Sequence, residues 1–192
     1  MPLKEPLQTS NSAPLELAGV LVETWAANDA MNQKLLEQLD AKAWRVEVKS
    51  AGGDTARTIA AIFAHMHNCR VNWLIWNAPH LKAPAKLNVR RSTKAQTAAA
   101  LRKSAALCGA MLADALSGSP DRKVRKFSRG WGRAWPAGGT MFAYMFSHEA
   151  HHRGQVLLLA HQLGFRLSRE AAGAIWNWDK LWKEQGFKER PR

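Results

Sequence analysis

The chain has 192 residues, a length that suits one domain with a core of its own. Hydrophobic residues make up 46% of the sequence, which excludes an intrinsically disordered protein. The formal net charge is +13, and a balance this basic leaves two alternatives: a polyanionic partner, or a surface that is basic without one.

The sequence begins with a polar segment that is followed by a long helical pattern. Residues 1–14 are rich in Pro, Ser, Asn and Gln, and we expect a flexible arm there. From residue 15, apolar residues recur at helical spacing as far as Leu39, which predicts an amphipathic helix. Residues 42–53 interrupt this pattern, and the alternation within 44–48 predicts a short extended piece.

Two further helices are predicted in the middle of the chain. Asp54 is the expected N-cap of the second helix, which carries apolar residues from Ile59 to Trp76. A break at Ala78-Pro79 ends it. The string Thr93-Lys94-Ala95-Gln96 has the pattern of a capping box and opens an Ala-rich third helix that ends at 117–120.

The last third of the chain contains a loop, a fourth long helix and a shorter one. Residues 122–136 form a basic, aromatic loop, and Gly164 is placed to end the helix that follows it. An amphipathic piece over 175–182 predicts a short C-terminal helix. Strand patterns are nearly absent, so we predict an all-α four-helix bundle over residues 15–186, with a flexible tail at 187–192.

The two cysteines and the absence of long apolar runs indicate the cellular compartment of the protein. Cys69 and Cys108 are far apart in sequence and do not form a disulfide framework, which favours a reducing environment. We find no apolar run of signal-peptide or membrane-spanning length. We therefore expect a soluble, cytoplasmic protein without a membrane partner.

Histidines on two predicted helices have metal-ligand spacing. His148 and His152 are four residues apart, so their imidazoles lie on one helix face about one turn apart. Such a pair offers two nitrogen ligands to one metal ion, and a third ligand must come from another helix. His65 and His67 on the second helix are both candidates, and hydrophobic periodicity does not separate them. The alternative is a chance pair in a His-rich segment.

The basic loop of residues 122–136 is a second candidate binding site. Its cations alternate with Phe127, Trp131 and Trp135, a composition that can bind phosphates and stack on bases. A solvated loop and a lid that recognises carboxylates are the two alternatives, and we favour them because the sequence contains no nucleic-acid-binding module. The candidate anion-binding residues are Arg125, Lys126, Arg129 and Arg133.

The sequence resembles the DinB/YfiT-like family, which is named for DNA-damage-inducible proteins and not for the DNA polymerase that shares the name. The most specific match is the string from His148 to Gln155, which ends in Gly-Gln. Weaker matches are Trp25-Ala26-Ala27-Asn28, the segment from Ala64 to Leu74, and the tail from Ile175 to Trp182.

The resemblance implies a site as well as a fold. It implies an up-down-down-up bundle, often as a homodimer, and a nickel or zinc ion held by His65, His148 and His152. His67 and His151 are alternative ligands, and Gln155 is expected to donate a supporting hydrogen bond. Relatives include transferases and isomerases that use a low-molecular-weight thiol, so the resemblance defines the site better than the reaction.

Two functions follow from these observations. The first is a metal-dependent transferase or hydrolase that acts on a small molecule, with the thiol as a candidate co-substrate. The alternative is a stress-response accessory protein with a structural metal, which binds nucleic acid through the basic loop. Glu149 directly follows His148, as a general base follows a ligand in metalloproteases. An apparent departure from the H-E-x-x-H spacing, together with the resemblance, leads us to reject that chemistry. We expect Glu149 at the surface or beside a ligand, and Cys69 as a packed thiol.

Overall fold

The computed structural model of the chain describes residues 16–49, 52–53 and 57–187, and its body is formed by four long helices. These are α1 (Leu17–Gln38), α2 (Ile59–Asn77), α3 (Lys94–Leu116) and α4 (Gly139–Gln162). The short helices α5 (Arg169–Trp176) and α6 (Trp178–Glu184) follow, and they pack on α1. The predicted all-α class is therefore confirmed. The predicted arm at 1–14 and residues 188–192 of the predicted tail lie outside the described residues.

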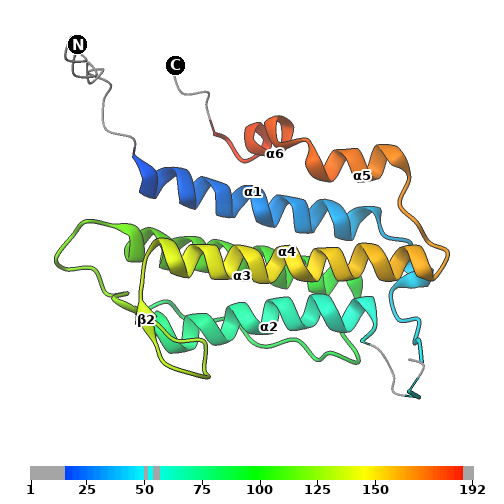
Figure 1. Cartoon of the computed structure of the whole chain (residues 1–192), viewed down its shortest axis with the longest axis horizontal. Coiled ribbons are helices and arrows are strands. Elements are labelled where there is room, and N and C mark those ends of the chain that lie inside the picture. Colours follow the sequence, from blue (N-terminus) through cyan, green and yellow to red (C-terminus); the bar gives the residue numbers. More distant parts are fainter. Residues whose placement is uncertain (1–15, 50–51, 54–56, 188–192) are drawn as a thin grey trace, which may run out of the picture.

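The long helices do not simply alternate in direction. In Figure 1, α1 and α4 run one way, and α2 and α3 run the opposite way. The parallel pair α2 and α3 requires a long connection, and residues 78–93 return along α2 to supply it. The indole of Trp25 on α1 donates a hydrogen bond to the carbonyl oxygen of Ala105 on α3 (2.9 Å), which ties α1 to its antiparallel neighbour.

Capping residues explain where several helices begin and end. The capping box of α3 is present, with the side chains of Thr93 and Gln96 each accepting from the other's backbone N–H. Gly164 adopts φ +81° after α4, and the N–H of Phe165 reaches back to Ala160, as in a Schellman motif. The N-cap of α2 is Thr58, which accepts from the N–H of Ala61, and not the predicted Asp54, which lies outside the described residues.

Three local features differ from what was predicted. Residues 44–48 do not form a strand: Trp44 and Arg45 lie in a turn after a short 3-10 helix (Ala41–Ala43), and residues 46–48 have no regular secondary structure. The basic loop contains a small antiparallel pair, β1 (Lys126–Phe127) with β2 (Trp135–Pro136), which was not predicted. The C-terminal helix is divided in two, since Asn177 interrupts it and caps α6.

The hydrophobic core forms two clusters along the bundle. One contains Leu35, Phe63 and Val156, and the other contains Trp25 and Met111. The side chain of Arg70, which is fully buried, touches both regions: it donates to the carbonyl oxygen of Leu101 and lies 5.1 Å from the Trp25 ring. A charged group therefore lies in the middle of the bundle, beside the site described below.

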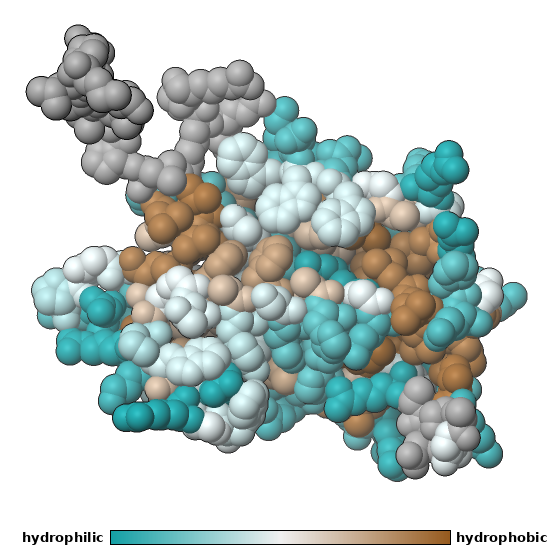
Figure 2. Space-filling model, in the orientation of Figure 1, coloured by the Kyte–Doolittle hydropathy of each residue, from teal (hydrophilic) through white to brown (hydrophobic). Residues whose placement is uncertain are grey.

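On the face of the molecule that Figure 2 shows, hydrophobic residues gather in two places. One is near the start of α1, where Leu17 is exposed, and the other is over the C-terminal half of α4, where Leu158 is exposed. Within the described ranges, no helix combines the length and the apolar character that crossing a membrane requires.

Candidate metal centre

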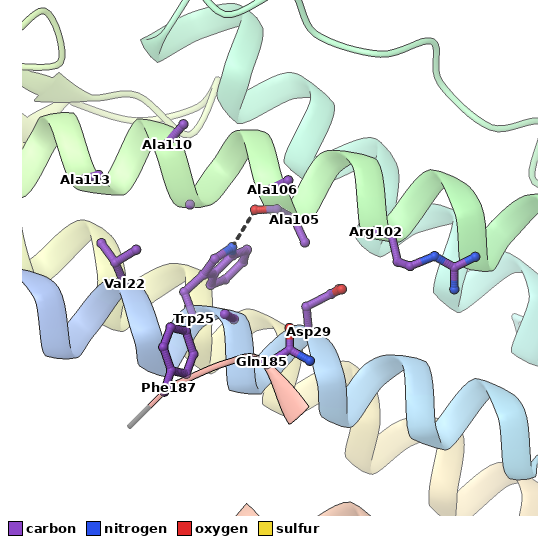
Figure 3. A pocket seen from close by; sticks show the side chains of 12 residues that line it. Val22, Trp25, Asp29, Arg102, Ala105, Ala106, Ala110, Ala113, Gln185 and Phe187 are labelled. Atoms are coloured by element: carbon purple, nitrogen blue, oxygen red, sulfur yellow. Dashed lines mark hydrogen bonds between the residues drawn. The ribbon is translucent and has the colours of Figure 1, made fainter. Parts of the chain in front are cut away.

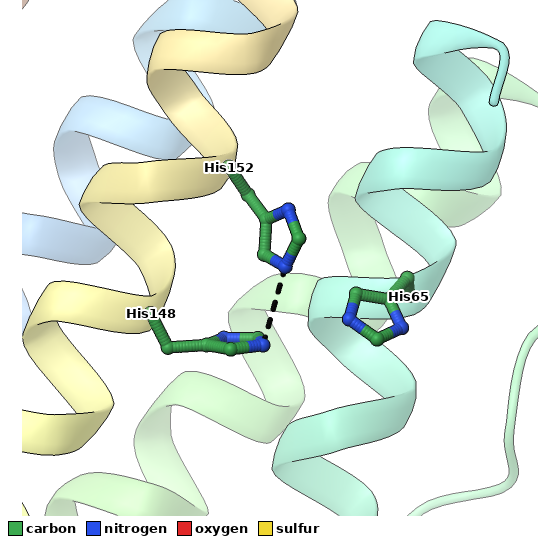
Figure 4. A group of neighbouring side chains, drawn as sticks. All are labelled: His65, His148 and His152. Carbon is green, nitrogen blue, oxygen red and sulfur yellow. Dashed lines mark hydrogen bonds between the residues drawn. The ribbon is translucent and has the colours of Figure 1, made fainter. Parts of the chain in front are cut away.

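Three histidines from two helices meet on one side of the bundle. His65 projects from α2, and His148 and His152 project from consecutive turns of α4 toward it (Figure 4). One ring nitrogen from each lies within 4.8 Å of the other two, and the Nε2 atoms of His148 and His152 are 3.2 Å apart. We call these three residues the histidine centre.

Gln155 determines which nitrogen of His152 is available. The Nδ1 atom of His152 lies 2.7 Å from the Oε1 atom of Gln155. Because Oε1 only accepts hydrogen bonds, Nδ1 carries the proton, and the lone pair of Nε2 faces the centre. The predicted supporting role of Gln155 thus has a partner in the structure, but Gln155 accepts the hydrogen bond and does not donate it.

His148 also keeps a lone pair that the described residues do not use. Its Nδ1 atom is buried and makes no hydrogen bond to any described residue. Its Nε2 atom faces Nε2 of His152, which has no proton to donate. Whichever nitrogen carries the proton, the other one is an unsatisfied acceptor, as expected for a metal ligand.

The environment keeps these rings neutral, which is the form that binds metals. Burial is the main cause that lowers the pKa of His65 to about 4, and the neighbouring His152 adds to it. Burial and the same neighbour lower the pKa of His148 to about 4. Burial also lowers the pKa of His152, although the hydrogen bond to Gln155 opposes this. The three imidazoles are therefore uncharged at neutral pH, and each has one ring nitrogen with a lone pair that can bind a metal.

The donor set fits a divalent ion. Two nitrogen ligands in a tetrahedral zinc site lie about 3.3 Å apart, since each Zn–N bond is about 2.0–2.1 Å. The 3.2 Å between the Nε2 atoms of His148 and His152 matches this value. A ring nitrogen of His65 lies within 4.8 Å of those of His148 and His152, so a short movement of His65 would bring it to the same separation. Imidazole is a ligand for zinc, nickel, copper and iron, so the ligands alone do not select the metal.

The other two candidate ligands lie elsewhere. His67 is fully buried on the far side of α2, where its ring nitrogens contact Ser104 Oγ and the carbonyl oxygen of Ala85, each at 3.0 Å. His151 is exposed, and only its ring edge approaches His152, at 5.1 Å between centroids. Neither residue belongs to the group of possible ligands found among the described residues.

Cys69 lies beside the centre without joining it. Its sulfur is 3.5 Å from Nε2 of His65, one helical turn away. Burial raises the pKa of the Cys69 thiol to about 11, so the sulfur stays protonated at neutral pH. The group of possible ligand atoms in the described part of the chain does not include this sulfur. Cys69 is part of the wall of the site.

Glu149 is not at the surface, which was one of its two predicted locations. It is fully buried, and its carboxylate accepts hydrogen bonds from Nε (2.5 Å) and Nη2 (2.7 Å) of Arg70. Burial would raise the pKa of Glu149, but the charge and hydrogen bonds of Arg70 outweigh it, so the pKa lies below its usual value. The string from His148 to His152 does have H-E-x-x-H spacing, so it is this burial, and not the spacing, that excludes Glu149 as a protease-type general base.

Glu149 belongs to a buried polar network that sequence reasoning did not foresee. Asn28 and Asn32 each donate to Oε2 of Glu149 (2.7 Å), and their own oxygens accept from Arg153. Asp29 accepts from Arg70 (2.8 Å), and burial raises the pKa of Asp29 more than Arg70 lowers it. The signal in the sequence was the i, i+4 spacing of Asn28 and Asn32, which places two amide side chains on one face of α1. The network (Asn28, Asp29, Asn32, Arg70, Glu149, Arg153) ties α1, α2 and α4 together directly behind the histidine centre.

The basic loop divides into solvated cations and one enclosed cation. Lys126 and Arg133 are exposed, and Arg125 is exposed while it donates to the carbonyl oxygens of Arg122 and Pro120. Arg129 is different, because its guanidinium carbon lies over the rings of both Trp131 (3.9 Å) and Trp135 (4.0 Å). The four predicted anion-binding residues therefore do not form one patch.

A separate hollow lies on α1 and α3. It has a volume of about 530 Å³, and its walls include Trp25, small residues of α3 such as Gly109, and Phe187 after α6 (Figure 3). None of its lining residues belongs to the histidine centre.

The fold and the site together define a helical-bundle protein with a three-histidine centre between its second and fourth long helices. The sequence model of the DinB family matches residues 8–169. The chain therefore belongs to the DinB family, as the resemblance of the α4 string indicated. No curated protein matches it closely enough to report.

Proposed function

We propose that this protein is a metal-dependent enzyme, a transferase or hydrolase that acts on a small molecule. The observation that carries the proposal is the convergence of three neutral imidazoles, one of which, His148, has a buried ring nitrogen without a hydrogen-bond partner among the described residues. Three nitrogen ligands leave coordination positions for water or substrate, whereas a structural zinc site is usually closed by four protein ligands.

The residues around the centre support this function. A divalent ion bound there would supply a Lewis acid that activates a bound water or thiol. His152 is oriented by Gln155, and His148 packs edge-on against Trp73 at 5.2 Å and stacks on Tyr144 at 6.4 Å between centroids. These aromatic rings exclude water from one side of the centre and fix the imidazole that they contact.

The metal is proposed to be nickel or zinc, and a low-molecular-weight thiol is proposed as a co-substrate. Both proposals rest on the family to which the chain belongs and on the ligand chemistry of imidazole. Cys69 does not replace the external thiol in this scheme, because burial keeps its sulfur protonated.

Elemental analysis of the purified protein tests the proposal. We expect near-stoichiometric nickel or zinc in the unmodified protein and its loss in His65→Ala and His148→Ala. His151→Ala is the matched control, since His151 lies on the same helix but is exposed and outside the centre. A protein that stays metal-free after incubation with nickel and with zinc, or a His148→Ala variant that keeps full metal content, would overturn it.

A further inference from the structure

Arg129 in the basic loop is packed against aromatic rings, whereas a solvated arginine is surrounded by water. Its guanidinium carbon lies 3.9 Å from the ring centroid of Trp131 and 4.0 Å from that of Trp135, so two indoles enclose it. Its Nε atom is buried and has no hydrogen-bond partner among the described residues. Within that part of the chain, the guanidinium makes no salt bridge either.

The loop around Arg129 is attached firmly to the bundle. The side chain of Asn77, at the end of α2, accepts from the N–H of Ser128 (2.6 Å) and donates to its carbonyl oxygen (3.0 Å). Gly130, at φ +81°, lies so close to Trp76 that a Cβ atom there would be 2.1 Å from the indole. Gly132 likewise leaves room for Nη2 of Arg129. The enclosed position of Arg129 is therefore built by the loop sequence.

The enclosed arginine is connected to the histidine centre by one aromatic ring. The guanidinium carbon of Arg129 lies 5.8 Å from the ring of Tyr144, and this ring stacks on His148 at 6.4 Å with an interplanar angle of 27°. Trp135 also packs edge-on against Tyr144, at 5.6 Å between ring centroids. The ring of Tyr144 therefore adjoins both Arg129 and His148, so that an aromatic surface links the loop cation to the histidine centre.

We propose that Arg129 binds the oxyanion, a carboxylate or a phosphate, of the substrate whose reacting end lies at the histidine centre. The inference rests on the proposed function. A guanidinium fork matches both oxyanions, and stacking between two indoles holds the fork in place before the ligand arrives, which reduces the entropy lost on binding. The substrate class is thus a small acid with an apolar or aromatic body.

The same loop is a weaker match for nucleic acid. The exposed cations Arg125, Lys126 and Arg133 are the ones that a polyanion would contact, and Arg125 already donates to two carbonyl oxygens of its own loop. Trp131 and Trp135, the rings that would stack on bases, are covered on one face by Arg129.

An NMR titration that follows the indole N–H signals of Trp131 and Trp135 tests the proposal. The probes are benzoate, phenyl phosphate and the neutral benzamide, added to the full chain. We expect benzoate or phenyl phosphate to shift both signals with saturation, and benzamide to bind about tenfold or more weakly, because it lacks the charge that the arginine pairs. The stronger of the two anions identifies the oxyanion.

Three variants make the result specific to Arg129. Arg129→Gln should weaken anion binding about tenfold or more, Arg129→Lys should restore part of it, and Arg133→Gln, the exposed control in the same loop, should leave it within about twofold. His65→Ala should lose the metal but keep the anion site, which separates a failure of this inference from a failure of the proposed function.

Three outcomes would overturn the inference. The first is equal weakening of anion binding by Arg129→Gln and Arg133→Gln, and the second is equal affinity for benzoate and benzamide. The third is a single-stranded oligonucleotide that binds more tightly than either small anion and loses that affinity in both Arg133→Gln and Arg129→Gln, which would assign the loop to nucleic acid.

Discussion

Glu149 directly follows the proposed metal ligand His148 in the chain, and it forms an ion pair across the bundle with Arg70. One residue step along an α-helix rotates the side chain by about 100°, so His148 faces α2 and the histidine centre while Glu149 faces the buried network. The bidentate contact with Arg70 therefore positions the helix turn that carries the ligand. Any movement of this turn changes the ion pair and the centre together.

We expect Glu149→Gln to lower the free energy of unfolding by about 3–5 kcal/mol, because it leaves the fully buried Arg70 with only part of its charge compensated. Urea unfolding measures this. Glu37→Gln is the control: it breaks the exposed contact with Lys34 and should cost about 1 kcal/mol or less. A loss below about 1 kcal/mol in Glu149→Gln would show that the network does not hold the bundle together.

Gln155 offers a test of ligand orientation that leaves the ligands intact. Gln155→Leu removes the acceptor for Nδ1 of His152, so we expect the affinity for nickel or zinc to fall about 10–100-fold. Gln155→Glu keeps an acceptor at the same position and should retain or raise the affinity. Competition with a chromophoric chelator gives both numbers. Equal affinities in the three proteins would show that the hydrogen bond does not orient His152.

The pH dependence of metal binding follows from the low pKa values of the centre. Ordinary histidines near pKa 6.5 bind protons below that pH and lose metal affinity. Burial lowers the pKa of His65 and of His148 to about 4, so both rings remain deprotonated as the pH falls from 7.5 to 5.5. We expect the affinity to change by no more than a few-fold over this range. A fall of about tenfold per pH unit or more below 6.5 would contradict these values.

Much of the fold could be predicted because local signals agreed with the tertiary structure. Hydrophobic periodicity found the four long helices, and the capping box at Thr93 and the terminal Gly164 placed two of their ends. The i, i+4 spacing on α4 put His148 and His152 on one face, as any α-helix must. These features depend on residues that are close in sequence, so the sequence alone was enough.

The remaining features depend on contacts between distant segments. His65 and His67 are about 200° apart on α2, but both flank its apolar stripe, and only the packing of α3 against His67 through Ser104 separates them. Glu149 and Arg70 look like surface residues until three helices bring them together, 79 positions apart. The pairing of β1 with β2 was missed because each strand has only two residues.

The close approach of Gly130 to Trp76 leads to a prediction for the whole basic loop. An alanine at position 130 would need a left-handed backbone, which costs about 1–2 kcal/mol, and its Cβ atom would overlap the indole of Trp76. We therefore expect Gly130→Ala to move the loop and to weaken benzoate binding at Arg129, with a loss of about 1–3 kcal/mol in the free energy of unfolding. Thermal or urea unfolding and the NMR titration measure the two effects.

Two further variants separate the overlap from the backbone strain. Gly118→Ala is the matched control, because its added Cβ meets open space and its backbone is not left-handed; its unfolding free energy should change by about 0.5 kcal/mol or less. Trp76→Ala combined with Gly130→Ala removes the overlap but keeps the strain. If the overlap displaces the loop, the double variant should regain benzoate binding relative to Gly130→Ala, and the two substitutions should be non-additive. Purely additive effects would mean that Trp76 does not position the loop.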